Sequence, residues 1–239
     1  MGTRAWLNLG LLALVIALGT IAYLQPGREP APEKPALVEL SRSEVDRIRV
    51  APRGGEPVVL ERSGGSEWQM TVPRGMPADR LKVRTLLDLL GARSQGTVAI
   101  PEGKAGDFGL KEPELVLEMG GHRMALGGDH PIRYQRYIRV DDTVHLVNKG
   151  AASRLGSDWT AYAHRGLLPP GSEPVRIALP TMTLQKGEDG TWTAAETDAD
   201  LEQRALKATV DAWRHRRALG IEALKGDPPK GEQVRVTLS

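Results

Sequence analysis

The chain has 239 residues, enough for one large or two small domains. Its 32 Lys and Arg residues nearly balance its 30 Asp and Glu residues, and the two signs are interspersed. This argues against a nucleic-acid-binding protein, which would concentrate positive charge on one face. The absence of cysteine excludes disulfides, thiolate metal sites and cysteine nucleophiles.

The N-terminal region contains a long apolar stretch. Residues 6–24, WLNLGLLALVIALGTIAYL, carry no charged side chain. A helix of this length rises about 28 Å, close to the ~30 Å hydrocarbon core of a bilayer. Trp6 and Tyr23 stand near its ends, where aromatic rings favour the membrane interface, and Arg4 favours a cytoplasmic N-terminus. We therefore expect residues 1–24 to form a single uncleaved signal-anchor helix that crosses the lipid bilayer through 6–24.

A cleavable signal peptide is the alternative reading of the same stretch. Its apolar region would be shorter, and Thr20-Ile21-Ala22 is a poor version of a cleavage site. Either reading exports the rest of the chain. Residues 25–37, which contain four prolines, are then expected to form an extended tether between the membrane and the folded part.

Two related modules follow the tether, at 38–168 and 169–239. In the first, VDRIRV (45–50), PVVLER (57–62) and EWQM (67–70) read as strands, and PADRLKVRTLLDLL (77–90) reads as a helix. The second repeats this order, with PVRIALPTMTLQK (174–186), Trp192 and a helical segment at 198–220. Leu60 aligns with Leu184, Trp68 with Trp192, and Leu87 with Val210. The pattern predicts an α+β fold of two related modules, each with antiparallel strands and a packed helix.

The rest of the first module supplies more strands. PELVLEM (113–119) and HRMALGG (122–128) flank Gly120-Gly121, which indicates a two-residue hairpin turn. RYQRYIRV (133–140) and TVHLVN (143–148) flank a second turn, and 151–168 reads as one or two short helices.

The second module appears incomplete in the sequence. GEQVRVTLS (231–239) resembles PELVLEM, with Leu117 aligned to Val236, but no hairpin partner follows it. The last strand is then an exposed edge, which proteins normally protect. We expect a truncated second module; an edge covered by a partner is the alternative.

The order of these segments resembles a bacterial family called domain of unknown function 4340. The resemblance covers residues 38–239 and depends on a tryptophan strand before the Pro77-Ala78-Asp79 helix start, the GLKEP step at 109–113 and the strand PIRYQRYIR at 131–139. It implies a single-pass protein of the bacterial inner membrane, in some members linked to ABC-type transport systems. The family supplies no catalytic or binding residues.

One strand carries the candidate binding surface. Residues on alternate positions of a strand share a face, so Arg133, Gln135, Tyr137 and Arg139 lie on one side. Arginines in such a row are able to hold carboxylates or an acidic partner. The alternative is a solvated sheet face with internal ion pairs.

No other pattern indicates chemistry. The five histidines lack the spacing of a helical metal pair, and Asp129-His130, the most suggestive site, is more simply a polar turn. Asp198 and Asp200 read as helix-start residues. The sequence therefore predicts no metal, no cofactor, no catalytic residue and no nucleic-acid partner.

The expected function is that of a membrane-anchored periplasmic accessory protein, not an enzyme, which contacts an envelope complex that resembles a transporter. A periplasmic sensor that binds a polysaccharide or peptide through Arg133–Arg139 is the alternative.

Overall fold

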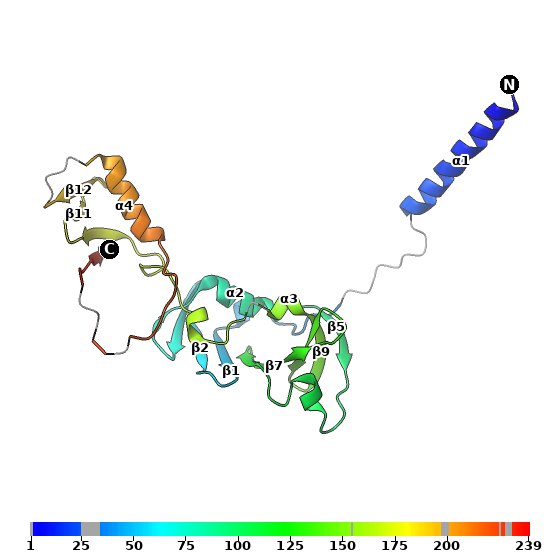
Figure 1. Ribbon diagram of the computed structural model, residues 1–239, viewed down its shortest axis with the longest axis horizontal. Coiled ribbons are helices and arrows are strands. Elements are labelled where there is room, and N and C mark those ends of the chain that lie inside the picture. Colours follow the sequence, from blue (N-terminus) through cyan, green and yellow to red (C-terminus); the bar gives the residue numbers. More distant parts are fainter. Residues whose placement is uncertain (1, 25–33, 154, 197–200, 225, 228–230) are drawn as a thin grey trace. The chain divides into compact units, whose positions relative to one another are not determined.

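The computed structural model describes all residues except 1, 25–33, 154, 197–200, 225 and 228–230 (Figure 1). The chain divides into two compact units, Met1–Pro35 and Ala36–Ser239. The predicted tether lies largely outside the described residues, as do Asp198 and Asp200.

The first unit contains helix α1, Thr3–Leu24. The large hydrophobic side chains described on it are exposed, from 56% for Leu18 to 88% for Tyr23. Over the residues that the structure describes, no helix combines the length and the apolarity required to cross a bilayer. The sequence prediction of a helix here is confirmed, but the prediction that 6–24 crosses the membrane is not supported.

The second unit is α+β, as predicted, and all of its strand pairs are antiparallel. Its larger sheet has nine strands in the order β4-β3-β2-β1-β6-β7-β8-β9-β5. These strands are β1 (Arg47–Pro52), β2 (Val58–Gly64), β3 (Glu67–Val72), β4 (Met76–Pro77), β5 (Ser94–Val98), β6 (Leu115–Met119), β7 (His122–Asp129), β8 (Gln135–Val140) and β9 (Thr143–Asn148).

Alternation of apolar residues directs one face of this sheet into the main core. Ile48, Leu60, Leu117 and Ile138 are fully buried there. Helices α2 (Arg80–Asp88) and α3 (Lys149–Ala152) cover this face (Figure 1). The short 3-10 helices η1 (Arg42–Glu44) and η3 (Trp159–Ala161) lie in the flanking segments.

The opposite face of the sheet has a smaller core of its own. Leu110, Ala125, Tyr137, Val144 and Leu146 are buried in it. The segment that includes the 3-10 helix η2 (Ala105–Phe108) packs over them. The sheet is therefore apolar on both sides around β7, β8 and β9.

The tight turn between β6 and β7 follows from its two glycines. Gly120 and Gly121 have φ of 58° and 81°, a region that other residues adopt only with strain. A Cβ at Gly120 would also lie 2.0 Å from Leu40 Cδ2. The predicted hairpin is present because glycine meets both requirements.

The smaller sheet has four strands in the order β12-β11-β10-β13. They are β10 (Pro174–Ala178), β11 (Thr183–Lys186), β12 (Trp192–Ala195) and β13 (Arg235–Leu238), and helix α4 (Gln203–His215) packs on them. The order matches β3-β2-β1-β6 of the larger sheet.

The aligned core residues have similar environments in the two sheets. Leu60 and Leu184 are both 0% exposed, and Trp68 and Trp192 are 4% and 8% exposed. The last strand differs from the alignment by two residues, because Val236 pairs with Ile177, whereas Ile48 pairs with Met119 and not with Leu117. A shift of two keeps Val236 on the core face.

Candidate binding site

The four candidate residues occupy different surroundings along β8. Arg133 is exposed in the turn before the strand, and Gln135 and Arg139 are half-buried on the strand itself. Tyr137 is buried, at 8% exposure. The structure thus places polar groups at both ends of the strand face and an aromatic residue between them.

Tyr137 belongs to the smaller core of the larger sheet. Its ring lies edge-on to Phe108, with centroids 4.9 Å apart, and 5.7 Å from the ring of His130. Such aromatic contacts add to the free energy of area burial. Tyr137 therefore fixes the strand against the segment that carries Phe108, and the accessible part of this face consists of Arg133, Gln135 and Arg139.

Gln135 carries an unusual polar atom. Its Oε1 is buried and accepts no hydrogen bond within the described part of the chain. An unsatisfied buried acceptor costs about 1–3 kcal/mol, so such atoms are rare in folded proteins. A ligand donor at this position would remove that cost.

Arg139 is the second group without a partner. No hydrogen bond or ion pair holds its guanidinium in the described structure. The contrast with Arg136, on the opposite face of the same strand, is clear: Arg136 binds Glu114 at 2.8 Å and Asp129 at 3.1 Å.

Arg139 lines a groove of about 490 Å³. Its walls include Val98, Ile100 and Val144, and two carboxylates, Glu102 and Asp142, lie at its border. A guanidinium presents a planar fork that pairs with a carboxylate through two hydrogen bonds. The groove therefore suits a ligand with a carboxylate and an apolar body, such as a peptide.

Asp129 and His130 form a polar turn, the simpler of the two readings of the sequence. The Nδ1 atom of His130 accepts the backbone N–H groups of Ile132 and Arg133, each at 3.2 Å. Hydrogen bonds from Lys149 and then Arg136 lower the pKa of Asp129. These bonds fix the loop before β8, and with it the position of Arg133.

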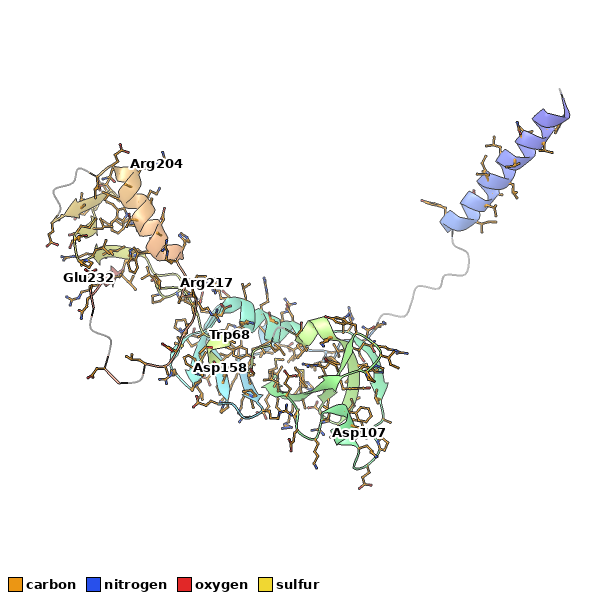
Figure 2. All side chains as sticks on the ribbon, in the orientation of Figure 1. Trp68, Asp107, Asp158, Arg204, Arg217 and Glu232 are labelled. Carbon is orange, nitrogen blue, oxygen red and sulfur yellow. The ribbon has the colours of Figure 1, made fainter. Side chains whose placement is uncertain are left out.

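One long-range contact was not predicted from the sequence. Arg217 falls within the helical segment expected at 198–220, but α4 ends at His215, and Arg217 lies just beyond it (Figure 2). Its Nη2 donates to Asp79 Oδ2 at 2.7 Å. A separation of 138 residues leaves no local signal for such a pair.

A second unpredicted contact joins His145 to Ser94, at 3.0 Å between Nδ1 and Oγ. Burial lowers the pKa of His145, so this imidazole is neutral near pH 7. Among the residues described, no group of three or more His, Asp or Glu side chains is placed to hold a metal ion.

Comparison with known proteins identifies a family. A model of the family described as a domain of unknown function (DUF4340) matches residues 68–229, more than half of the chain. No curated protein and no solved structure matches. On this match the chain belongs to the DUF4340 family.

Proposed function

We propose that this protein is a non-enzymatic module of the bacterial envelope, attached to the inner membrane by α1 and with its folded unit in the periplasm. The surroundings that α1 requires support this proposal most directly. Leu7, Leu9, Leu12 and Val15 are all exposed and project on different sides of the helix, because successive residues differ by about 100°. A helix that is apolar all round needs an apolar environment on every side, which lipid supplies.

A topology experiment tests this location. Alkaline phosphatase, which folds only outside the cytoplasm, is fused after residue 40. We expect enzyme activity from this fusion and none from a cytoplasm-specific reporter at the same site. The opposite pattern would overturn the periplasmic assignment.

The role of the folded unit is to bind a partner in the envelope, for which the resemblance suggests a transporter-like complex. The groove beside Arg139 is the proposed contact, because its guanidinium lacks a partner within the described residues. A photo-crosslinking residue at Thr143, which lines this groove, should capture the partner in native membranes.

Arg84 provides a matched control, since it is an exposed arginine on α2, the helix that covers the opposite face of the sheet. The same crosslinker at Arg84 should give no such adduct, and Arg139→Glu should abolish the adduct at position 143. Equal adducts at both positions would count against the groove.

A sensor for a periplasmic peptide is the second candidate function. It is favoured by the size of the Arg139 groove, about 490 Å³, and by the guanidinium of Arg139, which has no partner among the described residues. Stabilisation of the purified chain by a carboxylate-containing peptide, without any protein adduct in membranes, would favour this reading.

The two modules are proposed to be an internal repeat. The shared strand order and the matched burial of Leu60 with Leu184 support this. The repeat allows the corresponding positions of the two sheets to be compared.

A further inference from the structure

Each sheet has a cation at the equivalent position, but the surroundings of the two cations differ. Arg62 is paired in register with Trp68 between β2 and β3, and Lys186 is paired in the same way with Trp192 between β11 and β12. The two cations are 124 residues apart, the same spacing that relates the two tryptophans.

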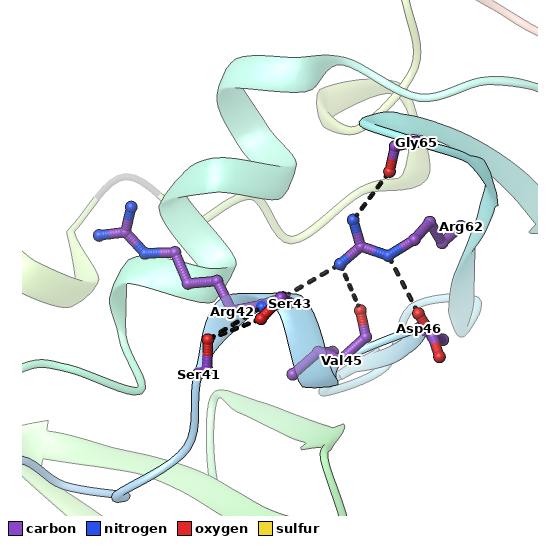
Figure 3. A network of polar contacts seen from close by, with 7 residues as sticks. All are labelled: Ser41, Arg42, Ser43, Val45, Asp46, Arg62 and Gly65. Atoms are coloured by element: carbon purple, nitrogen blue, oxygen red, sulfur yellow. Dashed lines mark hydrogen bonds and ion pairs between the residues drawn. The ribbon is translucent and has the colours of Figure 1, made fainter.

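In the larger sheet, Arg62 is fully engaged by a segment of its own chain (Figure 3). Its Nε binds Asp46 Oδ1 at 3.0 Å, and its Nη2 donates to the carbonyl oxygens of Arg42 and Val45 at 3.0 and 2.7 Å. Its guanidinium also lies 4.9 Å from the ring centroid of Trp68. One short stretch, 42–46, which includes the 3-10 helix η1, thus supplies a carboxylate and two carbonyl groups to this cation.

The smaller sheet lacks the matching carboxylate. The sequence SEVDRI (43–48) corresponds to SEPVRI (172–177), so Val175 stands where the first copy has Asp46. Arg176 is paired with Gln185, which places Val175 opposite Lys186 when the register is extended by one residue. The residue at the position of Asp46 is therefore apolar and offers Lys186 no carboxylate.

An open groove of about 520 Å³ lies beside Lys186 and Trp192. One flank of α4 forms its other wall, with Arg204 and Lys207 (Arg204 is labelled in Figure 2). Gln203 ties this wall to the sheet, since its Oε1 accepts from the backbone N–H of Trp192 at 3.4 Å.

The charge of the groove is not balanced. Of the described residues that line it, four are cations and two are carboxylates, an excess of two positive charges. Both carboxylates, Glu173 and Asp211, are paired with Arg214. Lys186, Arg204 and Lys207 have no ion pair or hydrogen bond among the described residues.

We propose that this groove binds an extended acidic peptide segment of a partner protein. Its carboxylates meet Lys186, Arg204 and Lys207, so that Lys186 gains the kind of partner that Asp46 gives Arg62, and its backbone lies along the groove beside Trp192. This site is distinct from the Arg139 groove and does not depend on where the protein is located.

Fluorescence anisotropy with the full chain in neutral detergent tests the site. The probe is a fluorescein-labelled decapeptide of alternating Glu and Ser, and the control probe has Gln in place of Glu. We expect the acidic peptide to bind, with an affinity that falls as salt rises, and the Gln peptide to bind at least about tenfold more weakly.

Charge reversal locates the binding. Lys186→Glu combined with Lys207→Glu should weaken binding of the acidic peptide by at least about tenfold, because each reversal replaces the attraction between unlike charges by repulsion between like charges. Lys111→Glu, at an exposed lysine of the larger module, is the matched control and should leave binding unchanged.

Introducing the missing carboxylate by substitution gives an independent test. Val175→Asp should provide Lys186 with the partner that Arg62 has in Asp46, and so weaken peptide binding several-fold without unfolding the chain. Equal binding by wild type, Val175→Asp and the double charge reversal would overturn the proposal. It would also be overturned if the lysines bound only vesicles containing phosphatidylglycerol and not the peptide.

Discussion

At the scale of single residues, Asp79 performs two structural tasks with its two carboxylate oxygens. Oδ1 accepts the backbone N–H groups of Leu81 and Lys82, at 2.9 and 3.2 Å, and thereby caps α2. Oδ2 accepts from Arg217. The cap begins the helix whose apolar face covers the main core, so Asp79 connects that helix with the segment after α4.

Substitutions separate these two tasks. Asp79→Ala removes both, and loss of the cap should lower the free energy of unfolding by about 1 kcal/mol. Asp79→Asn retains a capping oxygen and should cost less. Arg217→Gln removes only the ion pair, which is half-exposed and should contribute less than about 1 kcal/mol. Urea denaturation measures all three; equal stability of Asp79→Ala and wild type would contradict the capping role.

Tyr162 gives the fold a dependence on alkaline pH. It is 1% exposed, its hydroxyl donates to the Gly156 carbonyl at 2.7 Å, and burial raises its pKa to about 12 from an ordinary 10.0. The folded state therefore holds the phenolic proton more tightly than the unfolded state. This contribution to stability is complete below pH 10 and is lost as the pH rises towards 12.

The matching variant is Tyr162→Phe, which has no proton to lose. Between pH 10 and 12, the wild-type free energy of unfolding should fall by as much as about 2–3 kcal/mol more than that of Tyr162→Phe, given 1.36 kcal/mol per pKa unit. Urea titrations across this range measure the difference. Parallel pH profiles for the two proteins would show that the pKa of Tyr162 is the same in the folded and unfolded states, against this prediction.

At the scale of elements, Leu60 and Leu184 allow each sheet to be perturbed separately. Both side chains are fully buried, in different core clusters. Leucine to alanine at such sites costs about 2–5 kcal/mol. In hydrogen exchange, Leu184→Ala should accelerate the amides of β10 to β12 and leave those of β1 to β3 protected, and Leu60→Ala should do the reverse. Acceleration of both sheets by either variant would show that they unfold as one.

The sequence predicts the elements of this fold better than their pairing. Alternation located β6 to β9, and the two glycines located the turn within them, because both signals are local. The sequence did not predict β5. This strand contains Gly96, with φ of 151°, and pairs with β9, which is distant in the sequence. The two-residue difference at Val236 has the same origin, since contacts with β10 set that register.

The candidate site was predictable in position but not in environment. Period-two alternation placed Gln135, Tyr137 and Arg139 on one face of β8. Nothing local showed that Phe108 and its neighbours would cover Tyr137, because that segment precedes β8 by more than twenty residues and has no strand pattern. The absence of a partner for Arg139 within the described chain likewise depends on which loops reach it.

At the scale of the whole molecule, the chain separates helix α1 from a unit with its own cores. The boundary lies between Pro35 and Ala36. The second unit begins at once with structure, since Leu37 N–H donates to Ala92 O at 2.9 Å and Leu37 is buried. The three clusters of buried residues therefore belong to the second unit, whereas the proposed membrane attachment would belong to α1.

Removal of residues 1–35 tests this division. Because Ala36–Ser239 is compact by itself and contains the three clusters of buried residues, the shortened chain should keep its far-UV circular dichroism. Its thermal midpoint should stay within about 2 °C, which corresponds to about 0.5–1 kcal/mol or less. It should also no longer sediment with membranes, whereas the full chain should. A shortened chain that unfolds would show that α1 supports the body; one that still sediments would show that the body itself binds the membrane.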